Sequence, residues 1–185
     1  YKLENDDSTL MMITLPKPLE NDGTTNIEMD FTVTIPNSLG RFGYGEKAIN
    51  LCNFYPIASA WNGSKFCTYP YYMAGDPFVS DVSDYDVTLR VPEGMIVAHT
   101  GSGQSTTESG ITTYTIAAPM VRDFAAVASR EFEVAEKKAG NVNIKSYYYK
   151  GQDEAGKSAL DYGVGSIEVF GNAFGAYPYD EYSVI

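Results

Sequence analysis

The sequence predicts a mainly β protein, an antiparallel β-sandwich followed by one C-terminal helix. Aromatic residues make up 14% of the chain, with 15 Tyr and 9 Phe, and this composition favours pleated, half-buried surfaces. Apolar and polar residues alternate in segments separated by Gly, Asn and Asp turns, which is typical of a sandwich rather than of alternating strands and helices. After Gly151 the apolar period becomes helical.

The clearest predicted strand is 27–35, where Ile27, Met29, Phe31, Val33 and Ile35 alternate with polar residues. The apolar run 10–15 is expected to form an earlier strand, followed by the turn signal 21–23. A loop is expected at 36–45, and the Gly- and Ser-rich stretch 101–106 is interpreted as a hairpin turn. Further strands are predicted at 48–55, 85–91, 95–98, 111–117, 124–132 and 142–149.

The pattern after Gly151 predicts an amphipathic helix over 152–174. Asp153 and Glu154 suit the first turn, and Gly175 is a plausible stop. Four internal glycines each weaken the helix, so we expect a packing partner that approaches closely at some of them. The predicted apolar stripe comprises Leu160, Val164, Ile167, Phe170 or Gly171, and Phe174, and the four internal glycines are Gly156, Gly163, Gly165 and Gly171.

Charge and hydropathy exclude two classes of partner. The chain has 13 Lys and Arg against 24 Asp and Glu, a net charge of −11, which argues against binding the phosphate backbone of a nucleic acid. No apolar run is long enough to span a membrane, so we expect no membrane span in this chain. Both ends have the character of cut points within a longer chain, and an extracytoplasmic and a cytoplasmic location are both compatible with the sequence.

Residues that carry catalysis are almost absent, so no catalytic and no metal-binding residues are predicted. His99 is the single histidine, and therefore no HExxH helix or two-histidine metal site can form. No Gly-x-Ser-x-Gly elbow accompanies it, so we interpret His99 as a hydrogen-bonded or surface residue at a strand end. Cys52 and Cys67 are too few for a structural zinc site. A disulfide between them is possible, although two free thiols are the commoner outcome.

Two clusters have both a functional and a structural interpretation. Four aspartates could hold a calcium ion, but their spacing fits no EF-hand and loop carboxylates are usually solvated. Nine aromatic rings lie close together in the sequence; exposed rings would stack on sugars or line a peptide cleft, whereas buried ones would form the sandwich core, which we favour. The aspartates are Asp76, Asp81, Asp84 and Asp86, and the rings are Phe54, Tyr55, Trp61, Phe66, Tyr69, Tyr71, Tyr72, Phe78 and Tyr85.

Several short segments, in this order, resemble the N-terminal β domain of the gluzincin zinc aminopeptidases. This is the family of alanyl aminopeptidase and leukotriene hydrolase, and the match is to its bacterial branch. The family's linker helix ends in a Phe-Gly-x-Tyr-Pro-Tyr pattern, which 174–179 reproduces. The other segments are MITLPKPL at 12–19, FTVTIP at 31–36, RFGY at 41–44, NLCNFYP at 50–56, GDP at 75–77, YDVTLRVP at 85–92 and VRDFA at 121–125.

The resemblance implies a piece of a larger zinc enzyme. Residues 1–150 would be a saddle-like β-sandwich domain lacking upstream strands, and 151–185 would be the linker helix and first strand of a truncated thermolysin-like catalytic domain. The zinc and its ligands would then lie in that missing catalytic domain, this chain's expected partner, and the chain alone would cleave nothing. In the family the β domain lends a Gln or Glu to bind the amino terminus of a peptide substrate. The matching strand here has Asn53 and Tyr55, which become the candidate substrate-binding residues.

Two further hypotheses come from other functional classes. The chain would be a free-standing extracytoplasmic binding module if the aromatic stretch grips a glycan or a protein. It would be a structural or assembly module if the helix at 152–174 docks on a neighbour.

Overall fold

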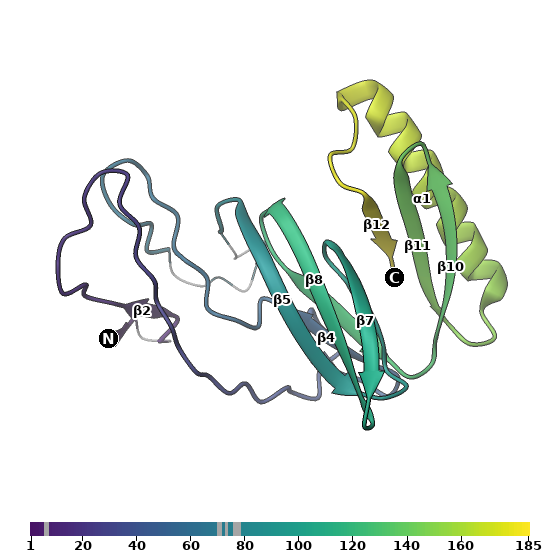
Figure 1. Cartoon of the computed structure of the whole chain (residues 1–185), viewed down its shortest axis with the longest axis horizontal. Coiled ribbons are helices and arrows are strands. Elements are labelled where there is room, and N and C mark those ends of the chain that lie inside the picture. Colours follow the sequence, from purple (N-terminus) through teal and green to yellow (C-terminus); the bar gives the residue numbers. More distant parts are fainter. Residues whose placement is uncertain (6–7, 70–71, 73, 76–78) are drawn as a thin grey trace. The chain divides into compact units, whose positions relative to one another are not determined.

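The computed structural model describes residues 1–5, 8–69, 72, 74–75 and 79–185, and it confirms a mainly β chain with several antiparallel sheets and one C-terminal helix (Figure 1). The chain forms two compact units. Unit 1 comprises 1–34 and 56–81, and unit 2 comprises 35–55 and 82–185. No helix in the described part of the chain combines the length and the apolar character needed to cross a bilayer.

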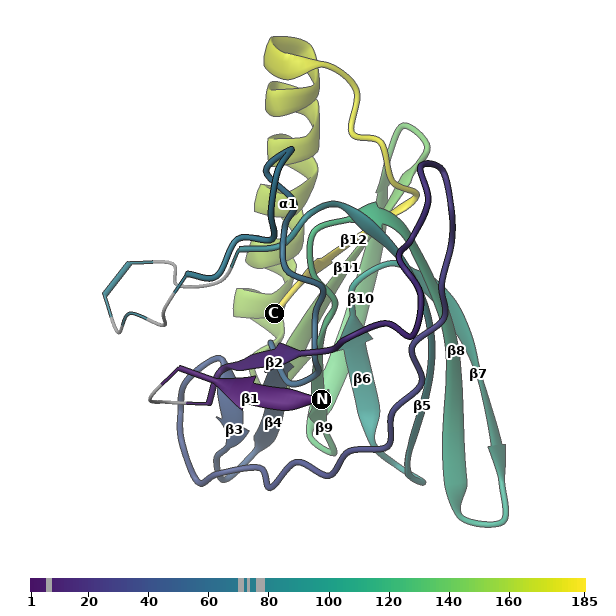
Figure 2. The ribbon, with the colours of Figure 1, turned by 90° about the vertical axis from the view of Figure 1, so that its left-hand side faces the viewer.

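Unit 1 contains little regular structure. Its strands among the described residues, β1 (Lys2–Glu4) and β2 (Leu10–Met12), pair antiparallel (Figure 2). β2 covers only the start of the strand expected at 10–15. The strand predicted at 27–35 is wrong for this structure, because the segment runs without strand pairing. Its alternation is present in the sequence, but no neighbouring strand satisfies its backbone groups.

The antiparallel sandwich lies in unit 2. One sheet has the order β5-β8-β7 and the other the order β3-β4-β9-β6, and every pair in both sheets is antiparallel. The strands of the first sheet are β5 (Ser83–Pro92), β7 (Ser102–Glu108) and β8 (Ile111–Val121). Those of the second are β3 (Phe42–Tyr44), β4 (Ala48–Cys52), β6 (Ile96–His99) and β9 (Ala125–Ser129).

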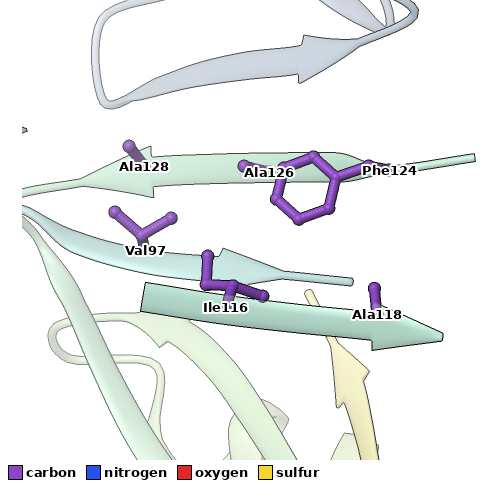
Figure 3. Packing of buried hydrophobic residues seen from close by; sticks show 6 residues of the cluster. All are labelled: Val97, Ile116, Ala118, Phe124, Ala126 and Ala128. Carbon is purple, nitrogen blue, oxygen red and sulfur yellow. The ribbon is translucent and has the colours of Figure 1, made fainter. Parts of the chain in front are cut away.

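The core between these two sheets is built from small and large side chains that face each other. Phe124, 1% exposed, fills the space beside alanines of β8 and β9 (Figure 3). On β5 every second residue is partly buried, which is the period that the sequence predicted for 85–91. The central cluster comprises Val97, Ile116, Ala118, Phe124, Ala126 and Ala128.

The second sheet of the sandwich is covered on both faces. Ala98 and Val127 lie on the face opposite to the core just described, and they pack against Phe132 and Tyr147. These two residues belong to β10 (Phe132–Ala139) and β11 (Val142–Tyr149), which form a third sheet with β12 (Glu181–Val184). Unit 2 therefore stacks three sheets.

The helix α1 (Asp153–Phe174) connects two parallel strands of this third sheet. β11 pairs parallel with β12, as the ends of a strand–helix–strand crossover do. Leu160 of α1 packs against Val142 and Ile144, both in β11. Figure 1 shows α1 running along β10 and β11. The domain division expected at 150/151 falls between β11 and α1, and it remains a prediction.

The helix confirms most of its predicted features. Gly175 has φ 109° and its N–H donates to the carbonyl of Gly171 at 3.1 Å, so it ends the helix as expected. Gly156 and Gly163 permit close approach, since a Cβ on Gly163 would lie 3.0 Å from Ile144 Cγ2 and one on Gly156 would overlap the Tyr148 ring. The predicted stripe is wrong at Phe170 and Phe174, which are 59% and 84% exposed, whereas Gly171, the alternative to Phe170, is partly buried.

Two segments expected to be irregular contain strands. The stretch 101–106, interpreted as a hairpin turn, lies mostly in β7, whose residues Ser102 to Glu108 pair with β8. β7 is an exposed edge strand of polar residues, so it lacks the apolar alternation that identifies a half-buried strand. The loop expected at 36–45 likewise contains the short strand β3.

Candidate functional site

The two candidate substrate-binding residues, Asn53 and Tyr55, converge on the carboxylate of Asp123. Asn53 Nδ2 donates to Asp123 Oδ2 at 2.7 Å, and the Tyr55 hydroxyl donates to Asp123 Oδ1 at 2.7 Å. The Phe124 backbone N–H donates to the Tyr55 hydroxyl at 2.9 Å. Because an N–H can only donate, the tyrosine oxygen accepts there and directs its own proton to Asp123.

The position of this cluster follows from the sandwich. Asn53 comes directly after β4 and Asp123 two residues before β9 begins, and these strands pair with Cys52 opposite Ala125. Asn53 has φ 53°, a left-handed conformation that asparagine tolerates better than most residues. The turn at Asn53 carries the chain away from the strand.

The electrostatics of the cluster keep its tyrosine protonated. Burial, followed by hydrogen bonds with Tyr85 and Asp123, raises the pKa of Tyr55 far above its ordinary value of 10.0. Burial and then the charge of Asp123 also raise the pKa of the neighbouring Cys52 thiol. Cys52 therefore stays a neutral thiol and a poor nucleophile at neutral pH, and both cysteines are free.

Acceptor capacity remains in this cluster after its internal bonds are counted. A carboxylate offers about four lone-pair positions, and Asp123 uses two of them on Asn53 and Tyr55. A hydroxyl has two lone pairs, of which Tyr55 uses one on the Phe124 N–H. Asn53 also retains its amide oxygen. This half-buried group can accept hydrogen bonds from a cation, whereas its one remaining side-chain donor is the second N–H of Asn53.

Asp123 is the residue that sequence reasoning missed as a member of this site. It lies within VRDFA, a segment quoted for the family resemblance, but no role was assigned to it there. It is 68 residues from Tyr55 and 70 from Asn53 along the chain. Only the pairing of β4 with β9 brings them together, and no local sequence signal reports such a contact.

His99 lies at the end of β6, as expected of a hydrogen-bonded histidine at a strand end. Its Nδ1 donates to the carbonyl of Thr100 at 3.2 Å, and burial lowers its pKa below 6.5. It lines a cavity of about 260 Å³ within unit 2, together with Tyr177, Tyr179 and Glu181.

Several polar groups around this cavity already have partners. Glu181 pairs with Lys145 at 2.8 Å, and both side chains are less than one-fifth exposed, at 18% and 19%. The Tyr179 hydroxyl donates to the Met120 carbonyl at 2.8 Å. Burial disfavours the charge on Lys145, but the hydrogen bond and the negative charge of Glu181, together with Tyr147 and Glu136, outweigh burial and raise the pKa of Lys145. These contacts join β12 and its approach to the rest of unit 2.

The aromatic stretch divides between core and surface. Phe54, Tyr55 and Tyr85 pack against the sandwich core, as favoured from the sequence. Four rings of unit 1 are exposed instead, and among them Trp61 and Phe66 form an edge-to-face pair with centroids 5.0 Å apart. Their exposed fractions are 54% for Trp61, 59% for Phe66, 62% for Tyr69 and 64% for Tyr72. Tyr71 and Phe78 lie outside the described residues.

Of the aspartates considered for calcium, the structure describes Asp81, Asp84 and Asp86. Asp84 accepts a hydrogen bond from the Met120 N–H at 2.8 Å, and Asp76 lies outside the described residues. Within the described ranges, no three His, Cys, Asp or Glu side chains are placed to hold a metal ion.

Comparison with known proteins finds likenesses among solved structures only. No family model matches the chain, and no curated protein matches it. Among solved structures, a mutant of a two-domain M1 zinc metallopeptidase bound to L-arginine matches with a TM-score of 0.42 and 18% identity. The match covers 58% of this chain and 27% of that one. A TM-score this low does not establish a shared fold, so the activity and the bound arginine belong to that protein.

Proposed function

We propose that this chain is the non-catalytic N-terminal region of a zinc-dependent metallopeptidase of the aminopeptidase type. Its role is to flank the active-site cleft and to help position a peptide substrate. The partner is the catalytic domain of the same protein, and the ligand is the free amino terminus of a peptide. The segments that resemble the gluzincin family, which occur in the same order along the chain as in that family, support this proposal at the sequence level.

The main structural support for this proposal is the cluster of Asn53, Tyr55 and Asp123. A substrate's terminal ammonium group has three N–H donors and needs oxygen acceptors, preferably with a negative charge. The cluster retains acceptors on all three side chains, and its internal bonds at 2.7 Å hold the carboxylate in one orientation. Binding the substrate's end in a fixed position lowers the entropic part of the barrier to hydrolysis.

Helix α1 supports the presence of a partner domain. Its inner face packs on the third sheet, yet Tyr162, Phe170 and Phe174 on the helix are 80%, 59% and 84% exposed. Phe170 and Phe174 contact each other with ring centroids 6.0 Å apart. A helix with apolar rings outside its packed face gains stability when another surface covers them.

The described residues of this chain do not fit a zinc site, so no step through the metal is assigned to them. Zinc in such enzymes polarises the peptide carbonyl and activates water. In this proposal that chemistry belongs to the catalytic domain, whereas Asp123 accepts from the substrate ammonium and Asn53 and Tyr55 hold Asp123 in place.

The test uses the full-length protein and peptides with free or acetylated amino termini. Asp123→Asn removes the charge but keeps the shape, and we expect kcat/KM on free peptides to fall by about 10- to 100-fold, since a hydrogen bond to a charged group contributes about 1.5–3 kcal/mol. Activity on acetylated peptides should stay unchanged. Tyr55→Phe and Asn53→Ala should act in the same direction with smaller effects. Equal losses on both peptide classes, or no loss on either, would contradict the proposal.

Asp84→Asn is the matched control for this series. It removes the same charge from an exposed carboxylate outside the cluster, which accepts a hydrogen bond from the Met120 N–H at 2.8 Å and keeps an acceptor oxygen as asparagine. We therefore expect this variant to behave as the wild type on both peptide classes. The reading frame beyond Ile185 gives an independent check, because the proposal requires an HExxH motif and a later Glu ligand there.

The exposed rings of unit 1 favour a second candidate, a module that binds a glycan or a protein. Trp61 is the single tryptophan of the chain, so its fluorescence reports on this surface alone. Saturable changes in Trp61 emission with an oligosaccharide or a peptide, lost in Phe66→Ala, would favour the module. An unchanged emission spectrum would count against it.

A further inference from the structure

Residues 24–34 have the side-chain pattern of a β-strand without a strand partner. Ile27, Met29, Phe31 and Val33 point alternately with polar residues, and they are 52%, 41%, 52% and 40% exposed. Every residue of this segment is exposed. Figure 2 shows the chain after β2 as an irregular trace.

The backbone of this segment is unpaired as well. No hydrogen bond connects 24–34 to any part of the chain that the structure describes. Extended backbone with free N–H and C=O groups on both edges is a template for pairing with another strand. Unlike most natural edge strands, this one has neither a proline nor a lysine within it to oppose pairing.

The charge of the polar face selects among possible partners. Glu28 and Asp30 lie on the same face, opposite to the apolar residues. If two copies paired antiparallel about Met29, Glu28 would lie opposite Asp30, and a parallel pairing in register would place each carboxylate opposite its own copy. Like charges directly opposite destabilise a strand pair, and the net charge of −11 adds repulsion between copies.

We propose that residues 24–34 are an interaction edge that accepts a β-strand from a partner protein, in which Lys or Arg alternate with apolar residues. Main-chain hydrogen bonds supply affinity, the row from Ile27 to Val33 is covered on one face, and the basic residues meet Glu28 and Asp30 on the other. A single added strand is smaller than a standard interface, so the association is weak and reversible. The proposal does not rest on the peptidase function.

The probe is a synthetic peptide in which Val alternates with Lys, and it has the same length as the segment 24–34. Backbone amide hydrogen exchange of the whole chain is measured with and without it. We expect exchange in 24–34 to slow by about tenfold or more at saturating peptide, because ladder hydrogen bonds protect amides from exchange. Two control peptides are used. One has the same Val and Lys residues in scrambled order, and the other, the Val/Glu peptide, has Glu in place of each Lys. Neither should slow amide exchange in 24–34.

Two variants separate charge from apolar contact. Glu28→Lys combined with Asp30→Lys should weaken binding of the Val/Lys peptide by about tenfold and strengthen binding of the Val/Glu peptide, because two cross-strand pairs reverse sign. Phe31→Ser should weaken binding of the Val/Lys peptide, and when it is added to the charge-reversed double variant it should weaken binding of the Val/Glu peptide. All three residues are exposed and without hydrogen bonds, so we expect each variant to fold as the wild type does.

Three results would overturn the proposal. The first is an absence of protection at millimolar Val/Lys peptide. The second is equal protection by the scrambled peptide. The third is protection of 24–34 in the peptide-free protein together with a dimer in light scattering, which would assign the edge to a second copy of the chain.

Discussion

The two units carry similar apolar and aromatic side chains but differ in what covers them. Unit 2 has three buried clusters, stacked between three sheets and a helix. In unit 1 no described residue is buried, and Trp61, Phe31 and Leu3 are all more than half exposed, at 54%, 52% and 52%. The difference shows that apolar content alone does not make a core, since strands must pair and sheets must stack before side chains leave water.

The largest test of this comparison exchanges two phenylalanines for alanine, one in each unit. Phe124→Ala in the sandwich core should lower the free energy of unfolding by about 3–5 kcal/mol, because Phe124 is 1% exposed and its removal leaves a cavity. Phe31→Ala in unit 1 should change it by no more than about 0.5 kcal/mol. Urea unfolding measures both, and a comparable loss in Phe31→Ala would show that unit 1 hides a core.

A smaller effect tests whether α1 is held by unit 2. Gly156→Ala should destabilise by about 1–3 kcal/mol, because its Cβ would overlap the Tyr148 ring. Gly165→Ala should stabilise by about 1 kcal/mol, because nothing lies within 4 Å of a Cβ there and alanine favours helix. Thermal unfolding of the two variants tests this. If both midpoints shifted in the same direction, α1 would not be docked on its sheet.

The smallest expected effect is a pH dependence of the free energy of unfolding, which comes from His99 in unit 2. His99 is the single histidine, and burial lowers its pKa below 6.5 in the folded state. The unfolded chain therefore binds this proton more readily, so stability falls as the pH drops through 6.5 towards the lower folded pKa, and falls no further below it. His99→Gln should remove this slope from urea midpoints measured between about pH 8 and pH 5. An unchanged slope would assign it to other groups.

The sequence predicted the parts of the fold whose signals are local. The strand at 142–149 and the helix at 152–174 agree with β11 and α1 almost to the residue, because alternation and helical period are properties of neighbours along the chain. Segment 27–35 has the same kind of signal and no strand, since a strand also needs a partner. β7 has the partner and no signal, since its side chains are polar on both faces.

The candidate site was predictable only in part. Asn53 and Tyr55 follow from a resemblance to a family strand, and whether they contact substrate stays a prediction. The structure adds Asp123, which orients both side chains through bonds that span 68 and 70 residues. Such a contact depends on which strands pair, and pairing is decided by the whole sheet rather than by nearby residues.

β4 is held by its pairing with β9 and β5 by its pairing with β8, and this affects how well the segment between β4 and β5 tolerates changes in length. Residues 56–81 leave unit 2 after Tyr55 and return to it at Val82, so they form an excursion whose two ends are held by the sandwich. The entropic cost of closing such an excursion grows only with the logarithm of its length. Insertions there cost the sandwich little, and this makes 56–81 the place where new recognition loops can be grafted onto a stable scaffold.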